Sequence, residues 1–158
     1  MIRLYREDDL PILMIIGNKA WQGIYKAYRE IYGKELYNII IKNAETRKGE
    51  QIRSYCDECP QNNFVCEEDG NIVGFVQFTM DKEAGIGEIG NNAVDPDCGL
   101  KGIGQQLYKA VLEHFRKNNI RYAKVVTGTD EGHAPARRAY ERSGFDIQVG
   151  QVTFYKKL

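Results

Sequence analysis

The sequence has no excess of charge of either sign, because 22 lysines and arginines are balanced by 22 aspartates and glutamates among 158 residues. Without net charge, a protein exerts little long-range attraction on a phosphate backbone or an anionic membrane surface. A nucleic acid is therefore not expected as its partner.

Long apolar runs are also missing. The run ILMII at 12–16 is far shorter than the ~20 residues that a membrane-spanning helix needs. The first ten residues, MIRLYREDDL, are charged, unlike a secretory signal. We therefore expect a soluble, cytoplasmic protein without membrane contact. Its length fits one domain over residues 1–158.

Clustered metal ligands are scarce. Cys56-x-x-Cys59 has the spacing of half a zinc site or of a redox motif, but Cys66 and Cys98 form no second pair. Pro60 follows where a redox motif would lead into a helix. No bound metal is expected, and the cysteines are interpreted as reduced thiols.

Alternating and helical patterns do recur along the chain. Charged and turn residues separate apolar segments whose period switches between that of a strand and that of a helix. The expected strands are 2–5, 63–68, 71–80, 88–94, 122–128, 145–150 and 151–157, and the expected helices include 8–21, 102–117 and 133–143. This order predicts a mixed α/β (α+β) domain with helices against a largely antiparallel sheet.

Three glycines lie around the start of one predicted helix, at Gly99, Gly102 and Gly104. Glycine permits a close backbone approach, and the first N–H groups of a helix lack intrahelical partners, so this segment can bind a phosphate. It does not match a P-loop, which needs lysine where glutamine stands, or a dinucleotide fingerprint, whose third glycine would replace Leu107. A flexible turn without a ligand is the alternative.

Two segments together resemble the GNAT N-acetyltransferase superfamily. AVDPDCGLKGIGQQL, at 93–107, is similar to its acyl-CoA-binding signature [Q/R]-x-x-G-x-[G/A], and HAPARRAYERSGF, at 133–145, to its motif N-x-x-A-x-x-x-Y-x-x-x-G-F. The order and spacing of both segments agree with that family. Gly99 replaces the usual Gln or Arg, and His133 replaces the usual Asn.

The resemblance implies a mostly antiparallel sheet of six to seven strands, flanked by about four helices and splayed between strands 4 and 5. The pantetheine arm of acetyl-CoA would pair with strand 4, and helix-start amides would hold the pyrophosphate. Ile103 would contribute its amide while its side chain faces the core. The cofactor-binding residues implied in this way are Asn92, Val94, Gly99, Leu100, Lys101, Gly102, Ile103, Gly104, Gln105, His133, Ala136 and Tyr140.

The implied reaction is transfer of the acetyl group from acetyl-CoA to an amine of a small molecule or peptide, by direct attack in a ternary complex. An amine with a pKa near ~10 must lose a proton before it attacks, so a base is needed. The resemblance implies Glu88 as base, often through water, and Tyr140 as the acid that protonates the leaving thiolate. Alternation places Glu88, Asn92 and Val94 on one face unless a bulge intervenes.

Other interpretations remain open from the sequence. The departures at Gly99 and His133 allow a CoA-binding sensor with weak chemistry, and the glycines alone allow a structural hinge. A covalent intermediate on Cys98 is not expected, because acyl-CoA is already activated. Homodimers are common among relatives, so a homodimer is an expectation by analogy.

The acceptor is not fixed by the sequence. Aromatic residues at helical spacing line either an acceptor pocket or, more commonly, the core. Two acidic residues before strand 4 are candidates to attract a cationic amine. These candidates are Trp21, Tyr25, Tyr28 and Tyr32, with Asp81 and Glu83.

Overall fold

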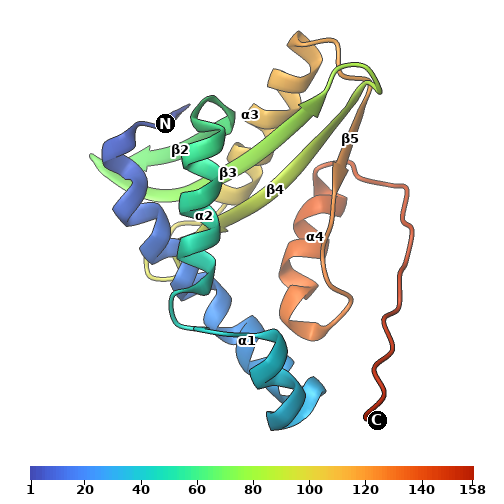
Figure 1. The fold of residues 1–158 in the computed structure, drawn as a ribbon. Coiled ribbons are helices and arrows are strands. Elements are labelled where there is room, and N and C mark those ends of the chain that lie inside the picture. The colour runs from blue at the N-terminus through green and yellow to red at the C-terminus, as the bar shows by residue number, and fades with distance from the viewer.

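The computed structural model describes all residues, 1–158, as a five-stranded sheet with helices on both faces (Figure 1). The strands follow one another in chain order across the sheet. The first four are antiparallel, and the last pairs parallel to the fourth. The strands are β1 (Ile2–Leu4), β2 (Asn63–Glu68), β3 (Asn71–Asp81), β4 (Ile86–Val94) and β5 (Tyr122–Val125).

Helices α1 and α2 cover one face of the sheet, and α3 and α4 pack on the other. Pro11 lies in the first turn of α1, where its missing N–H is tolerated. Gly33, with φ of 70°, interrupts the same helix and redirects its last turns. No helix is both long and apolar enough to span a membrane. The helices are α1 (Leu10–Ile40), α2 (Arg47–Glu58), α3 (Ile103–Lys117) and α4 (Ala134–Arg142).

Strand β3 forms the centre of the core because both of its faces are buried. Val76 and Phe78 pack with α3, while Phe75 packs with Val65 of β2 under α1 and α2. The near-continuous apolar run of β3 thus reflects burial on two sides, whereas a strand with one wet face would alternate.

Close packing of α3 on β3 depends on Gly74. A Cβ atom there would lie 2.9 Å from the Ala93 carbonyl oxygen and 3.1 Å from Ile103 Cγ2. We expect Gly74→Ala to lower the free energy of unfolding by about 1–3 kcal/mol, as overpacking does. Urea unfolding measures this change. Gly23→Ala is the control, because it meets nothing within 4 Å and adds helix propensity; an equal loss in both variants would contradict the prediction.

The sheet has five strands, so the expectation of six to seven is wrong. Residues 145–150 and 151–157 were predicted as strands from their alternating apolar pattern, but they form no ladder. After Phe145, which packs on Tyr140, the tail contacts α1 only near its end: the rings of Tyr155 and Tyr32 are 5.7 Å apart, and Lys157 pairs with Glu35 at 2.8 Å. Local alternation gives strand propensity, but a strand also needs a neighbour.

Candidate active site

Strands β4 and β5 diverge at one end of the sheet (Figure 1). Their parallel pairing ends at Ile89 and Val125, while β4 continues to Val94. The Asp95 amide donates to the Val73 carbonyl at 2.8 Å, so Asp95 points its main-chain groups toward β3. Because these groups alternate along a strand, those of Asn92 and Val94 point to the open edge. That edge can accept an extended ligand as an added strand.

A bulge reverses the phase of β4 before this edge. Asn92 pairs with Val76 and Ile89 with Phe78, so Gln77 alone lies opposite Gly90 and Asn91. Asn92 and Ile89 both contact the α3 side, whereas Glu88 and Asn91 point to the α1 and α2 side. The expectation that Glu88 shares a face with Asn92 and Val94 is therefore wrong. The cause is the extra residue of the bulge.

The glycine-rich segment has a left-handed backbone at two of its glycines. Gly99 and Gly102 have φ of 67° and 81°, and Gly102 is the N-cap of α3. No atom lies within 4 Å of the position of a Cβ at either glycine, so the space beside them is open. Leu100 and Lys101 are exposed, while the Ile103 side chain is buried in the core. The segment thus leaves helix-start amides accessible to an anion.

Gln105 has a role that its sequence position did not indicate. Its side-chain amide donates to the Ala139 carbonyl at 2.8 Å, and the Ser143 hydroxyl donates to its oxygen at 3.1 Å. The Gln105 side chain therefore fastens α3 to α4, and only its main chain is available to a ligand.

Tyr140 lies at the splayed edge and is 7% exposed. Asn92 connects it to a second tyrosine: the Tyr108 hydroxyl donates to Asn92 Oδ1 at 2.7 Å, and Asn92 Nδ2 donates to the Tyr140 oxygen at 3.2 Å. Burial, with the neighbouring Tyr140, raises the pKa of Tyr108, which therefore stays protonated. Since the Tyr140 oxygen accepts this bond, its own proton is left to donate elsewhere.

Sequence reasoning did not find Tyr108. The signal was available, because Tyr108 follows Gly104 by one helical turn and so faces the same side of α3. Its ring centroid lies 5.1 Å from that of Tyr140, and the pair belongs to the buried cluster under α3.

His133 is held at the start of α4, with Nδ1 2.7 Å from Asp130 Oδ2. Arg137 supports the same turn by donating to the carbonyls of Gly128 and Asp130, each at 2.7 Å. This places His133 two helical turns before Tyr140, with Ala136 half-buried between them. His133 is thus part of a structural turn beside the splayed edge.

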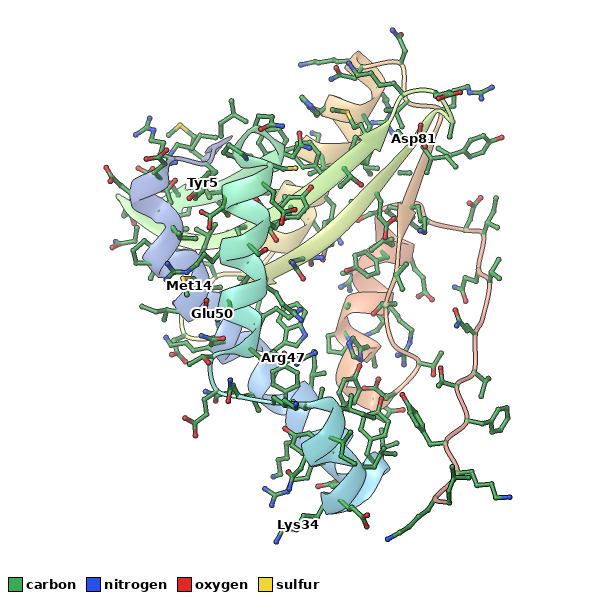
Figure 2. The ribbon with its side chains drawn as sticks, in the orientation of Figure 1. Tyr5, Met14, Lys34, Arg47, Glu50 and Asp81 are labelled. Atoms are coloured by element: carbon green, nitrogen blue, oxygen red, sulfur yellow. The ribbon has the colours of Figure 1, made fainter.

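The acceptor candidates fall into two groups. Tyr25 is buried among aromatic residues of α1, which supports a core role, whereas Tyr28 lies 6.1 Å from His133, ring to ring. Asp81 and Glu83 occupy the β3–β4 hairpin, at the opposite end of β4 from Asn92; Figure 2 shows Asp81 there, far from Arg47. These two acidic residues therefore do not approach the splayed edge.

The cysteines do not form a reactive pair. Cys56 is buried in α2, and burial raises the pKa of its thiol to about 11, opposite to the shift of a redox cysteine. All four cysteines are free.

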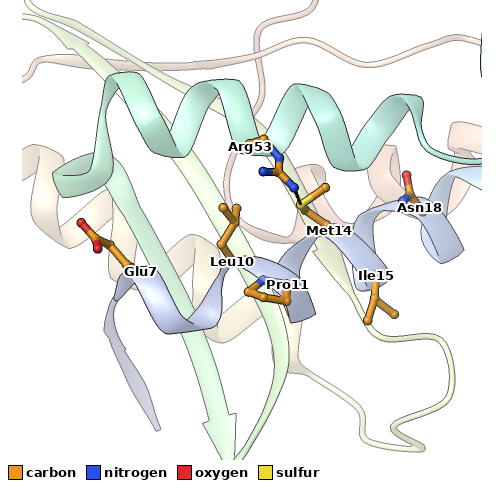
Figure 3. Close-up of a pocket in the computed structure, with 7 residues that line it drawn as sticks. All are labelled: Glu7, Leu10, Pro11, Met14, Ile15, Asn18 and Arg53. Carbon is orange, nitrogen blue, oxygen red and sulfur yellow. Dashed lines mark hydrogen bonds between the residues drawn. The ribbon is translucent and has the colours of Figure 1, made fainter.

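A separate hollow lies between the outer surfaces of α1 and α2 (Figure 3). It has a volume of about 480 Å³ and is lined by Leu10, Met14 and Arg53, among others. Neither tyrosine of the splayed edge lines it. We therefore place the candidate site at the divergence of β4 and β5.

Residues 21–145 match the sequence profile of the Acetyltransferase (GNAT) family. The chain belongs to this family. One relative, the S-(2-succino)cysteine N-acetyltransferase of Bacillus subtilis, is 33% identical over 105 residues, which cover 60% of this chain and 64% of that protein. The N-acetylaspartate synthetase of Homo sapiens is 30% identical over 118 residues, which cover 74% of this chain and 38% of that protein.

An uncharacterized N-acetyltransferase of Methanocaldococcus jannaschii is 26% identical over 152 residues, or 92% of this chain and 60% of that protein. The chain thus spans less than two thirds of the length of these relatives.

Solved GNAT structures share the fold. A PaiA N-acetyltransferase of Thermoplasma acidophilum, in complex with coenzyme A, superimposes with a TM-score of 0.67 at 19% identity, covering 96% of this chain and 92% of that one. A GNAT acetyltransferase of Brucella melitensis, in complex with acetyl-CoA, gives a TM-score of 0.63 at 20% identity, covering 93% and 82%. The mixed α/β fold expected from the sequence is confirmed.

Proposed function

We propose that residues 1–158 form one acetyltransferase domain that transfers the acetyl group of acetyl-CoA to an amine of a small molecule or peptide. One observation carries the proposal: the unpaired edge of β4 lies between accessible helix-start amides and a tyrosine with a free proton. The family and the coenzyme A complexes of fold neighbours support the donor. The relatives differ in their named acceptors and do not select one.

Different residues of the site bind different parts of acetyl-CoA. Main-chain groups of Asn92 and Val94 pair with the pantetheine arm, and amides from Leu100 to Gln105 bind the pyrophosphate. Lys101 adds a positive charge to this anion site. His133 and Ala136 lie on the α4 side of the edge, where the acetyl end of the donor is expected.

The reaction is a direct transfer in a ternary complex. The amine nitrogen attacks the thioester carbonyl, so that a C–N bond forms as the C–S bond breaks. The amine proton passes through water to Glu88, and Tyr140 gives its proton to the leaving sulfur before solvent restores it. Glu88 lies on the face of β4 opposite Tyr140, which allows base and acid to act from different sides.

The test combines a binding and a turnover measurement. Calorimetry should detect saturable binding of CoA and acetyl-CoA, and a thiol-release assay with an amine panel should detect turnover. Binding without turnover would favour the alternative of a CoA sensor, which the departures from the family motifs at Gly99 and His133 allow. No binding at millimolar ligand would refute both functions.

Replacing Glu88 with glutamine is expected to lower kcat at neutral pH at least about tenfold, because a base typically contributes that much or more. The loss should shrink as the pH approaches the amine's own pKa, since the amine then needs no base. Steady-state kinetics over a pH series measures this. Lys124→Met is the control: it breaks the 2.9 Å ion pair with Glu88 but keeps the carboxylate. An equal loss in both variants would assign Glu88 a structural role.

The homodimer and the cytoplasmic location stay predictions. Exposed apolar side chains of the C-terminal tail, Val149, Val152 and Phe154, support the dimer because a second copy would cover them.

A further inference from the structure

Lys48 is a buried cation on the α1 and α2 side of the candidate site. It is 8% exposed, although it is the second residue of α2. Its ammonium lies 4.2 Å from the ring centroid of Trp21 and donates to Asn91 Oδ1 at 3.1 Å. An ammonium has three N–H groups, so two remain after this bond.

No carboxylate neutralises this charge. None of the ion pairs includes Lys48, and the charged residue that acts on its pKa, Arg47, has the same sign. Burial lowers the pKa of Lys48 to about 8, and the charge of Arg47 acts in the same direction. The positive end of the α2 dipole also disfavours two cations in the first turn. Such a group costs stability unless an anion completes it.

A chain of side-chain amides fixes this arrangement. Asn91 Nδ2 donates to Gln77 Oε1 at 2.9 Å, and Gln77 Nε2 donates to Asn63 Oδ1 at 2.8 Å. Asn63 Nδ2 in turn donates to the Cys59 carbonyl at 2.7 Å. Because each amide nitrogen is committed inward, the Asn91 oxygen must face Lys48. The lysine is therefore held in place without its charge being neutralised.

The position of Lys48 relative to Tyr140 follows from the alternation of side chains along β4. Asn91 and Asn92 are consecutive in β4, so Asn91 bonds Lys48 on one face and Asn92 bonds Tyr140 on the other. Consecutive Cα atoms are about 3.8 Å apart. Lys48 and the acid of the reaction thus flank one point of the splayed strand.

We propose that Lys48 binds a carboxylate of the acceptor, so that the acceptor is an amine that also carries a carboxylate, such as a free amino acid. This inference rests on the proposed function for the identity of the acceptor. The carboxylate takes the two free N–H groups of the ammonium and supplies the missing negative charge. The amine is then directed at β4 from the side opposite Tyr140.

Trp21 provides a direct test, because it is the only tryptophan of the chain and contacts the Lys48 ammonium. With CoA present, its fluorescence is titrated with acetate, succinate and benzoate, and with acetamide, succinamide and benzamide. At least one carboxylate should bind at least tenfold more tightly than its amide. Lys48→Met should abolish this preference. The exposed-site variant Lys117→Met is the control and should retain it.

Three outcomes of this titration would contradict the inference. Equal binding of acids and amides, no response to any carboxylate, or an unchanged preference in Lys48→Met overturns the inference. Thermal unfolding checks that Lys48→Met folds. Lys48→Gln, which can still donate to Asn91, replaces it if it does not.

A kinetic experiment distinguishes failure of this inference from failure of the proposed function. Amino acids and their carboxamides are compared as acceptors in the thiol-release assay. A preference for the acids that Lys48→Met lowers at least tenfold, through the acceptor KM and without change in the acetyl-CoA KM, supports the inference. Equal turnover of acids and amides overturns it while the acetyltransferase activity stands. Carboxylate binding through Lys48 without any turnover supports the anion site and contradicts the proposed function.

Discussion

Tyr140→Phe is expected to lower kcat about 10²-fold or more, while the dissociation constant for CoA changes less than about threefold. The substitution keeps the ring that packs on Tyr108 but removes the proton that the Asn92 contact leaves free. The leaving thiolate must then depart without an acid. Steady-state kinetics and calorimetry measure the two quantities on the same preparation.

The matched control for this prediction is Tyr122→Phe, because Tyr122 is exposed on β5 and outside the tyrosine pair. Its turnover should equal that of the parent chain. If Tyr140→Phe also turns over at the parent rate, the hydroxyl has no role as acid. A parallel loss of CoA affinity would instead point to a binding role.

Gly102→Val is expected to weaken CoA binding at least about tenfold. Gly102 has φ of 81°, a region that costs a residue with a Cβ about 1–2 kcal/mol, and β-branching adds to this strain. The N-cap of α3 must then rotate, and the helix-start amides lose their common direction. Calorimetric titration with CoA measures the loss.

Gly150→Val serves as the control, because Gly150 lies in the exposed tail with open space around it. Its CoA affinity should match the parent. The unfolding midpoint of Gly102→Val distinguishes lost binding from lost folding. A variant that binds CoA normally would show that the pyrophosphate is not held at the start of α3.

The sequence predicted those parts of the site that depend on local rules. The helix after Gly99 and Gly102 and the short helix bearing Tyr140 follow from apolar period, and the positive φ of both glycines is one that glycine permits. Helix α2 was not predicted, because its sequence RKGEQIRSYCDE is mostly polar and only a narrow stripe, with Ile52 and Cys56, reaches the core.

The tertiary contacts of the site could not be predicted from local sequence rules. The Tyr108–Asn92–Tyr140 contact joins three elements, and the Lys48–Asn91 contact joins residues 43 positions apart. Alternation along β4 assigned the wrong face to Glu88, since nothing local in the sequence located the bulge opposite Gln77. The C-terminal tail was wrongly predicted to form strands for a related reason: its alternating pattern is local, but no strand of the sheet pairs with it.

Because of the extra residue opposite Gln77, the site also depends on the number of residues in β4, and not only on the identity of its side chains. Deleting Gly90 alone, with every reacting side chain retained, would restore regular pairing and invert the upstream half of β4 relative to the downstream half. Either Ile89 would leave the core or Asn92 would turn away from both tyrosines. A frame-preserving loss of one codon would thus disrupt the proposed site as thoroughly as removal of the Tyr140 hydroxyl.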